Sequence, residues 1–253
     1  LDASFCNIDE IDAGQAVKLQ NHSMTLYGNP VTSITWAYEI ELKKIPAWLR
    51  TLEKLEDANL EYSNVGEMRG GAFPPSLEWL RICRLPEGLR FHPDSFEGLP
   101  NLWYLDANTN KITEDDMHPG LFAGASSLRD IELYGNTGMR RFNATELFPG
   151  GSKTVRLLNL DMCGLKEGTS FQGLPYLKRM ELRFFSALPP RLFSGLCALR
   201  TGEGGRLNLE YSTWGDDTFA GTTLCNAISN NDAAKAACLE QADADSESGC
   251  GCQ

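Results

Sequence analysis

The chain has 253 residues, a formal net charge of −11 and 42% hydrophobic residues, enough to bury a sizeable core. The acidic balance argues against nucleic acid and anionic membranes as partners, because both require a basic surface. No apolar run is long enough for a membrane-spanning helix, and no N-terminal Met or signal-peptide core is present, so the sequence predicts a mature, soluble chain.

The first 30 residues resemble part of a repeat that recurs farther along the chain. The run Leu1-x-Ala3-x-x-Cys6-x-Ile8 matches the second half of that repeat, and Val17-x-Leu19 is spaced like a further strand. We therefore expect residues 1–30 to form an abbreviated N-terminal cap or a partial repeat. The alternative is that earlier repeats precede Leu1.

Residues 31–224 carry two interleaved patterns. In the first, Phe is followed two residues later by Gly and, in most copies, six residues later by an aliphatic residue. This motif recurs six times, at Phe96, Phe122, Phe148, Phe171, Phe193 and Phe219. In the second, aliphatic residues stand at the first, fourth and sixth places and a small or amide residue stands at the ninth. The fourth places fall at residues 34, 58, 80, 105, 131, 158, 180 and 202, a period of 22 to 27 residues.

This self-similarity resembles the leucine-rich-repeat family, in the longer form common in extracellular proteins. The runs Leu188-Pro189-Pro190-x-x-Phe193 and Ile45-Pro46-x-x-Leu49 are typical of that form. The resemblance implies an α/β fold: a right-handed solenoid of about eight turns, with a short-strand parallel sheet on the concave face and loops or short helices on the convex face. Elementary physics agrees, because one repeat cannot bury its own apolar edge and must stack on the next.

The ninth place of each repeat is expected to point inward, where an Asn side chain can bond backbone groups that the sheet leaves unpaired. Asn110, Asn136 and Cys163 occupy this ladder, with Cys as the weaker substitute. We expect Cys6 and Cys163 to be buried thiols and Cys83 to lie near the exposed edge of its strand. Each repeated Phe is expected to be buried.

The places between the aliphatic residues face outward from the predicted inner sheet, so the register also predicts surface columns. Cations occupy the second place of four consecutive turns, and acids gather at the fifth place. Aromatic residues lie at the turns where the second place changes from acidic to basic residues. In one interpretation the aromatics anchor a partner whose acidic groups the cations bind. In the other the columns neutralise one another as exposed ladder pairs. In the last turn, the third place falls on Thr201. The candidate ligand-binding residues are Trp79, Trp103, Tyr104, Arg129, Tyr134, Arg156, Lys178, Arg179 and Arg200.

Residues 225–253 are predicted to form a disulfide-stapled C-terminal cap and an acidic tail. The disulfide candidates are Cys225, Cys238, Cys250 and Cys252, and a bridge from Cys197 to Cys225 is also possible. A helix is expected from Asn231, which resembles the cysteine-bearing caps of the family, although Cys250-Gly-Cys252 departs from their usual order. The spacing is unsuited to zinc, and Asp243–Glu247 lacks the glycine and glutamate of a calcium loop.

Catalysis finds little support, because the three histidines sit in no motif that pairs a base with a nucleophile, and no cofactor or metal site is expected. Two glycosylation sequons, at Asn21 and Asn143, fit a secretory route.

The sequence therefore predicts a non-catalytic, extracellular module, secreted or at the cell surface, that binds a protein or an anionic glycan on its concave sheet. The alternative is a structural subunit of a matrix, wall or filament that associates with copies of itself. Neither nucleic acid nor membrane insertion is expected.

Overall fold

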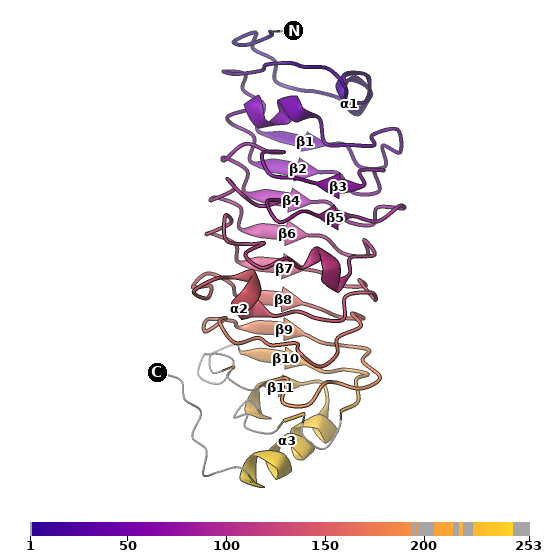
Figure 1. The fold of residues 1–253 in the computed structure, drawn as a ribbon, viewed down its shortest axis with the longest axis vertical. Helices are drawn as coiled ribbons and strands as arrows, with labels where there is room; N and C mark the ends of the chain where they lie inside the picture. Colours follow the sequence, from indigo (N-terminus) through magenta and orange to yellow (C-terminus); the bar gives the residue numbers. More distant parts are fainter. Residues whose placement is uncertain (1, 194–195, 197–204, 215–217, 220–224, 245–253) are drawn as a thin grey trace. The chain divides into compact units, whose positions relative to one another are not determined.

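The computed structural model describes residues 2–193, 196, 205–214, 218–219 and 225–244 (Figure 1). The chain forms two compact units, unit 1 with residues 1–112 and 120–129 and unit 2 with residues 113–119 and 130–253. Within each unit, short parallel strands are stacked in chain order and joined by long connections. Each unit is therefore a parallel β-solenoid with few helices, as predicted.

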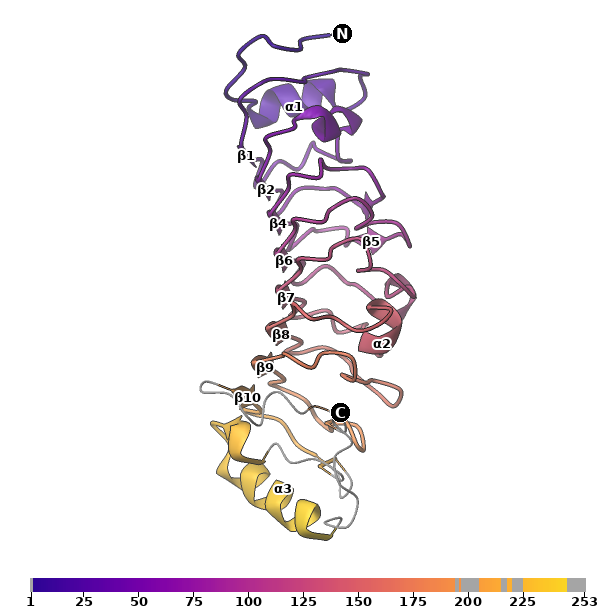
Figure 2. The ribbon, with the colours of Figure 1, turned by 90° about the vertical axis from the view of Figure 1, so that its left-hand side faces the viewer.

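Unit 1 contains a parallel sheet and a second, two-stranded sheet. The main sheet has the order β1 (Ser33–Thr35), β2 (Asp57–Asn59), β4 (Trp79–Arg81), β6 (Tyr104–Asp106). The second sheet pairs β3 (Glu67–Met68) with β5 (Arg90–Phe91), and it lies on the side of the unit away from the main sheet (Figure 2). The helices are α1 (Ala13–Leu19) and the 3-10 helix η1 (Ala47–Thr51).

Unit 2 continues the same pattern with the strands β7 (Asp130–Glu132), β8 (Leu157–Asn159), β9 (Arg179–Glu181), β10 (Arg206–Asn208) and β11 (Ile228–Ser229). Its helices are α2 (Ala144–Leu147), α3 (Asp232–Ala244) and the 3-10 helices η2 (Glu114–Asp116) and η4 (Cys225–Ala227). In Figure 2, α2 lies on the side away from the strands.

The strand register agrees with the predicted fourth places except in one turn. Ile34, Ala58, Leu80 and Leu105 pair in sequence in unit 1, and Ile131, Leu158 and Met180 pair in unit 2. Met180 then pairs with Leu207, five residues beyond the predicted mark at Gly202. Glycine has no side chain to fill the core, whereas Leu207 and Leu209 are fully buried. The prediction also missed β11, where Ile228 pairs with Leu207.

The repeated Phe residues form the apolar interior, as predicted. All six are at most 5% exposed, and neighbouring rings meet within a unit, with centroids 5.0 Å apart for Phe96 and Phe122 and 5.5 Å apart for Phe193 and Phe219. At Gly124 the glycine permits the close approach of the preceding turn, because a β-carbon there would lie 2.4 Å from the Phe96 carbonyl oxygen. Burying each Phe contributes about 1.5–3 kcal/mol.

Ladder residues bond the backbone of the preceding turn. The Asn110 amide nitrogen donates to the carbonyl oxygens of Ile82 at 2.5 Å and Ala107 at 3.2 Å, and its Oδ1 accepts from the Leu85 backbone. The Cys163 thiol donates to the Leu133 carbonyl at 3.3 Å. In the β10 turn, whose register was mispredicted, the Ser212 hydroxyl takes this role and donates to the Leu182 carbonyl at 2.6 Å.

The N-terminal segment differs in part from expectation. Val17 and Leu19 lie in α1 rather than in a strand, because the Asp12 carboxylate accepts from the Gln15 backbone and caps the helix. Asp2 does form a parallel bridge with Thr25. Asn29 supplies the ladder contacts here, since its amide nitrogen donates to the Ala3 carbonyl at 2.9 Å.

Two thiol predictions were wrong. Asn29 occupies the ladder of the first turn, so Cys6 is exposed and its thiol reaches only the Ser4 carbonyl, at 3.5 Å. Cys83 is buried beside Asp106, and burial is the main cause that raises the pKa of its thiol. Cys163 is buried as predicted, and burial raises its pKa to about 12.

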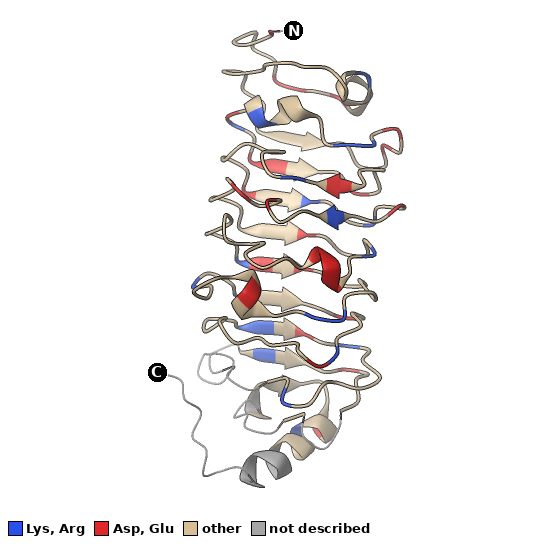
Figure 3. Cartoon of the chain, in the orientation of Figure 1, with Lys and Arg blue, Asp and Glu red and all other residues tan. Residues whose placement is uncertain are grey.

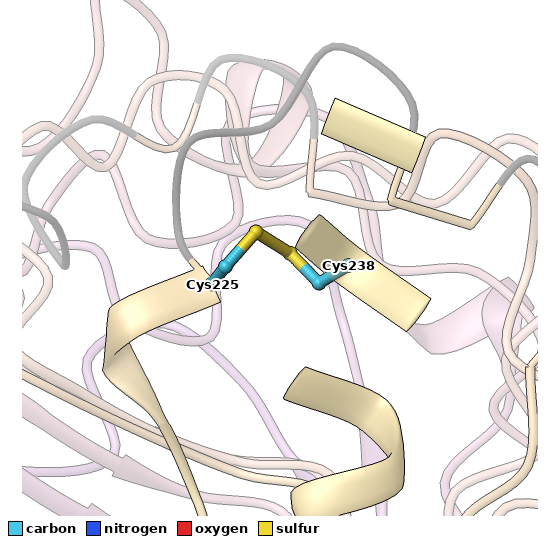
Figure 4. The surroundings of a disulfide bond; sticks show 2 residues. All are labelled: Cys225 and Cys238. Atoms are coloured by element: carbon cyan, nitrogen blue, oxygen red, sulfur yellow. A yellow bond between two sulfur atoms is a disulfide. The ribbon is translucent and has the colours of Figure 1, made fainter. Parts of the chain in front are cut away.

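Two of the four candidate cysteines form a disulfide: Cys225 at the start of η4 is bonded to Cys238 in α3, with Cα atoms 5.4 Å apart (Figure 4). This bond excludes the alternative bridge between Cys225 and Cys197. Cys197, Cys250 and Cys252 lie outside the described residues. The bond joins the last strand turn to the terminal helix.

The buried Phe residues should dominate stability. Phe171→Ala removes a side chain that is 0% exposed and should lower the free energy of unfolding by about 3–5 kcal/mol. Phe184→Ala, in the same unit, removes a ring that is 49% exposed and should lower it by less than about 1 kcal/mol. Urea unfolding followed by far-UV circular dichroism measures both, and equal losses would contradict the assigned core.

Thiol accessibility should follow the burial of the three described free cysteines. In native protein at pH 7 to 9, iodoacetamide should modify Cys6, which is exposed. It should leave Cys83 and Cys163 unmodified, because burial keeps their thiols protonated and inaccessible. Peptide mass mapping reads the three sites separately, with urea-unfolded protein as the control in which all three react. Native labelling of Cys83 as fast as Cys6 would refute the register around β4.

Candidate binding surface

The structure brings together the aromatic residues predicted from the columns of unit 1. Trp79 in β4 and Tyr104 in β6 pair across the strands, and their rings stack with centroids 5.1 Å apart. The Trp103 ring meets Tyr104 edge-on at 5.9 Å and is 37% exposed. These three residues, the aromatic cluster, offer apolar surface that is partly open to solvent.

The aromatic cluster has a cation that the site prediction left out. The Arg81 guanidinium lies 4.6 Å from the Trp79 ring centroid and 3.4 Å from the Asp106 carboxylate. Arg129 was predicted, and it is exposed one turn beyond Trp103, whose carbonyl accepts from its backbone nitrogen at 2.9 Å. Cation and ring contacts of this kind are common in protein interfaces.

Acidic residues lie on the neighbouring turns of unit 1. Asp57 pairs with Trp79 across the strands, and its pKa is raised, first by partial burial and then by the nearby Glu78. Figure 3 shows acidic colouring on β2. The exposed strand face of unit 1 is therefore aromatic with acidic neighbours.

Unit 2 holds most of the basic residues of the predicted columns. Arg156 stands beside Lys178, whose backbone nitrogen donates to the Arg156 carbonyl at 2.8 Å, and Arg179 pairs with Arg206 across β9 and β10. Lys178, Arg179 and Arg206 are exposed and Arg156 is half-buried. Figure 3 shows basic colouring at the start of both β9 and β10. We call Arg156, Lys178, Arg179 and Arg206 the basic group.

The last turn of the predicted cation column must be corrected. Arg200 lies outside the described residues, and the register of β10 puts Gly205 at the second place and Arg206 at the third. Arg206 thus stands where the spacing predicted Thr201. The sequence signal for Arg206 was the run Arg206-Leu207-Asn208-Leu209, in which Leu207 and Leu209 alternate with polar residues.

Ion pairs neutralise only part of unit 2's surface. Arg179 contacts Glu181 at 2.7 Å, and Arg156 lies 5.0 Å from the Tyr176 ring centroid. Within the described part of the chain, neither Lys178 nor Arg206 forms a salt bridge. The neutralised-column interpretation therefore holds for Arg179 but not for the whole group.

Beside the basic group lies an ion pair with a buried carboxylate that the prediction missed. Asp161 is 0% exposed and accepts from the Arg183 side chain at 2.6 Å, which raises the pKa of that guanidinium. Tyr134, a predicted binding residue, is half-buried after β7. Among the described residues, no hydrogen bond, ion pair or ring contact joins it to the basic group.

The predicted glycosylation residues differ in accessibility. Asn21 is exposed. Asn143 is half-buried at the start of α2, where its Oδ1 accepts from Thr145 and its amide nitrogen donates to Glu146 at 3.0 Å. A glycan is attached through that amide nitrogen, so Asn21 presents the more accessible acceptor.

The described residues lack two features typical of other functional classes. No group of three or more His, Cys, Asp or Glu side chains there is arranged to hold a metal ion. No helix among them is both long and apolar enough to cross a membrane.

No family model and no curated protein matches the chain. Among solved structures, it is similar to a chain of the octameric complex of Latrophilin 3, Unc5D and FLRT2, with a TM-score of 0.49 and 17% identity over 87% of this chain and 79% of that chain. It is also similar to TLR13 in complex with ssRNA13, with a TM-score of 0.46 and 19% identity over 83% and 33% of the two chains. For human 5T4, or trophoblast glycoprotein, the values are 0.42 and 16% over 90% and 84%. These neighbours are leucine-rich-repeat proteins, and likeness at this level carries no conclusion about ligand or partner.

Proposed function

We propose that the chain is a non-catalytic, extracellular recognition module that binds an acidic protein or an anionic glycan on the strand face of unit 2. The basic group carries this proposal. Arg156, Lys178, Arg179 and Arg206 come from the turns of three successive strands, and three of the four side chains are exposed. Clustered cations attract anionic partners, and here they stand out against a chain charge of −11.

The incomplete neutralisation of the group supports binding over simple surface pairing. An exposed ion pair contributes only about 0–1 kcal/mol, so Arg179 and Glu181 gain little from each other. Lys178 and Arg206 make no salt bridge among the described residues, and two uncompensated cations on adjacent turns repel each other. An anionic ligand removes that repulsion.

The aromatic cluster supports recognition of a partner by unit 1 as well. Trp and Tyr residues dominate the binding energy of many protein interfaces, because they bury large areas at a small cost in conformational entropy. Trp103 remains 37% exposed although its neighbours stack. The Cys225–Cys238 disulfide and the exposed sequon at Asn21 fit the extracellular location that we propose.

Charge reversal within the basic group tests the proposal. Lys178→Glu with Arg206→Glu should weaken binding of fluorescein-labelled poly-glutamate or chondroitin sulfate by tenfold or more, roughly, because attraction becomes repulsion. Lys153→Glu with Lys166→Glu is the matched control: both lysines are exposed in unit 2, outside the strands, and the net charge change is the same. Fluorescence anisotropy gives the dissociation constants.

Equal weakening by both double variants would contradict a localised site, as would failure of the wild-type protein to bind either probe. Sedimentation velocity over a dilution series addresses the alternative of a structural subunit. A dilution-stable monomer agrees with the proposal, whereas ordered oligomers that the charge reversal leaves intact would contradict it.

A further inference from the structure

Three large apolar side chains stand exposed on successive turns of unit 2. Met162, Phe184 and Tyr211 are 40%, 49% and 68% exposed, and each is the fourth residue after its register mark in β8, β9 or β10. The Phe184 and Tyr211 rings stack with centroids 5.0 Å apart. We call these three residues the apolar ladder.

The backbone at the apolar ladder is unfavourable for such side chains. Their φ angles are 53°, 65° and 59°, in the left-handed region, where a residue with a β-carbon costs roughly 1–2 kcal/mol. Gly135 holds the same place one turn before Met162, with a φ of 75°, so glycine suits this position. The same place also has a left-handed φ in the turns of unit 1, at Tyr38, Tyr62, Arg84 and Thr109, so this backbone conformation belongs to the repeat. In unit 2 the place carries exposed apolar side chains on three successive turns, and burial in the core does not account for them.

Glu181 and Arg183 connect the basic group to the apolar ladder. Arg179 contacts Glu181 at 2.7 Å, and Glu181 lies 3.8 Å from Arg183. The Arg183 guanidinium lies 5.9 Å from the ring centroid of Phe184. Phe184 in turn stacks on Tyr211, so the exposed cations and the exposed apolar side chains lie close together in the β9 and β10 turns.

The chemistry of this surface distinguishes a polypeptide from a glycan. A sugar stacks on an open aromatic face, and Tyr211 covers one face of Phe184. The exposed parts of the two rings and the Met162 thioether pack well against the apolar side chains of a protein. The basic group beside them requires carboxylates from the same partner.

We infer that the basic group and the apolar ladder together bind an acidic polypeptide segment that carries aromatic or aliphatic side chains. The carboxylates contact Lys178, Arg179 and Arg206, and the apolar side chains pack on Met162, Phe184 and Tyr211. This inference rests on the proposed function, because it names the partner of the same surface.

The test compares three labelled probes: poly-glutamate, a random glutamate–tyrosine copolymer of the same length and chondroitin sulfate. Wild-type protein should bind the copolymer about tenfold more tightly than poly-glutamate, because only the copolymer can engage the apolar ladder. Phe184→Ser with Tyr211→Ser should abolish that preference and leave poly-glutamate binding unchanged. Fluorescence anisotropy measures all three probes.

Phe5→Ser with Tyr38→Ser is the matched control. It makes the same two replacements at residues of unit 1 that are 81% and 69% exposed and also have left-handed φ angles, and it should keep the preference. Circular dichroism melts confirm that each variant is folded before binding is measured.

Each failure has its own signature. If the wild type binds poly-glutamate and the copolymer equally, or if the Phe184/Tyr211 variant keeps the preference, the inference is wrong while the proposed function stands. Tighter binding of chondroitin sulfate than of the copolymer also overturns the inference, in favour of a glycan. If the wild type binds none of the three probes, the proposed function itself fails.

Discussion

Hydrogen bonding from each turn to the next is the constraint on which the rest of the structure depends. A chain that leaves a three-residue strand has backbone carbonyls with no partner in its own turn, and buried polar groups without partners are costly. Asn110 and Ser212 meet this need by donating to carbonyls of Ile82 and Leu182 in the preceding turns. Successive turns must therefore stack in a fixed register, and the buried Phe residues follow it.

The surface columns are a consequence of that register. Once Met180 pairs with Leu207, Arg179 is opposite Arg206, and Phe184 and Tyr211 come into stacking distance. Within its own turn, each residue of the basic group is an ordinary surface cation. Repetition brings like residues together over successive turns, and two of the four cations, Lys178 and Arg206, form no salt bridge in the described part of the chain. The same repetition gathers Trp79 and Tyr104 in unit 1.

Most strands of the main sheet, the buried Phe residues and the aromatic cluster could be predicted because hydrophobic spacing marks them directly. The predicted register position at Gly202 was wrong because regular spacing leads into a glycine-rich run that has no apolar side chain to bury. Leu207 occupies the fourth place of that turn instead. Cys83 was misplaced because spacing alone does not show that Asp106 of the next turn covers it. The apolar ladder escaped prediction for a related reason: left-handed backbone is usually signalled by Gly or Asn, and here Met, Phe and Tyr occupy it.

The register of β10 is the central claim, since it decides which cations and rings are neighbours. Cross-linking by dibromobimane, which joins thiols only a few ångströms apart, tests it directly in two double-cysteine variants. Arg179→Cys with Arg206→Cys should yield the fluorescent cross-linked peptide pair, because these residues pair across β9 and β10. Arg179→Cys with Thr201→Cys, the pair that repeat spacing alone would favour, should not. Cross-linking of residues 179 and 201 in place of 179 and 206 would contradict the account.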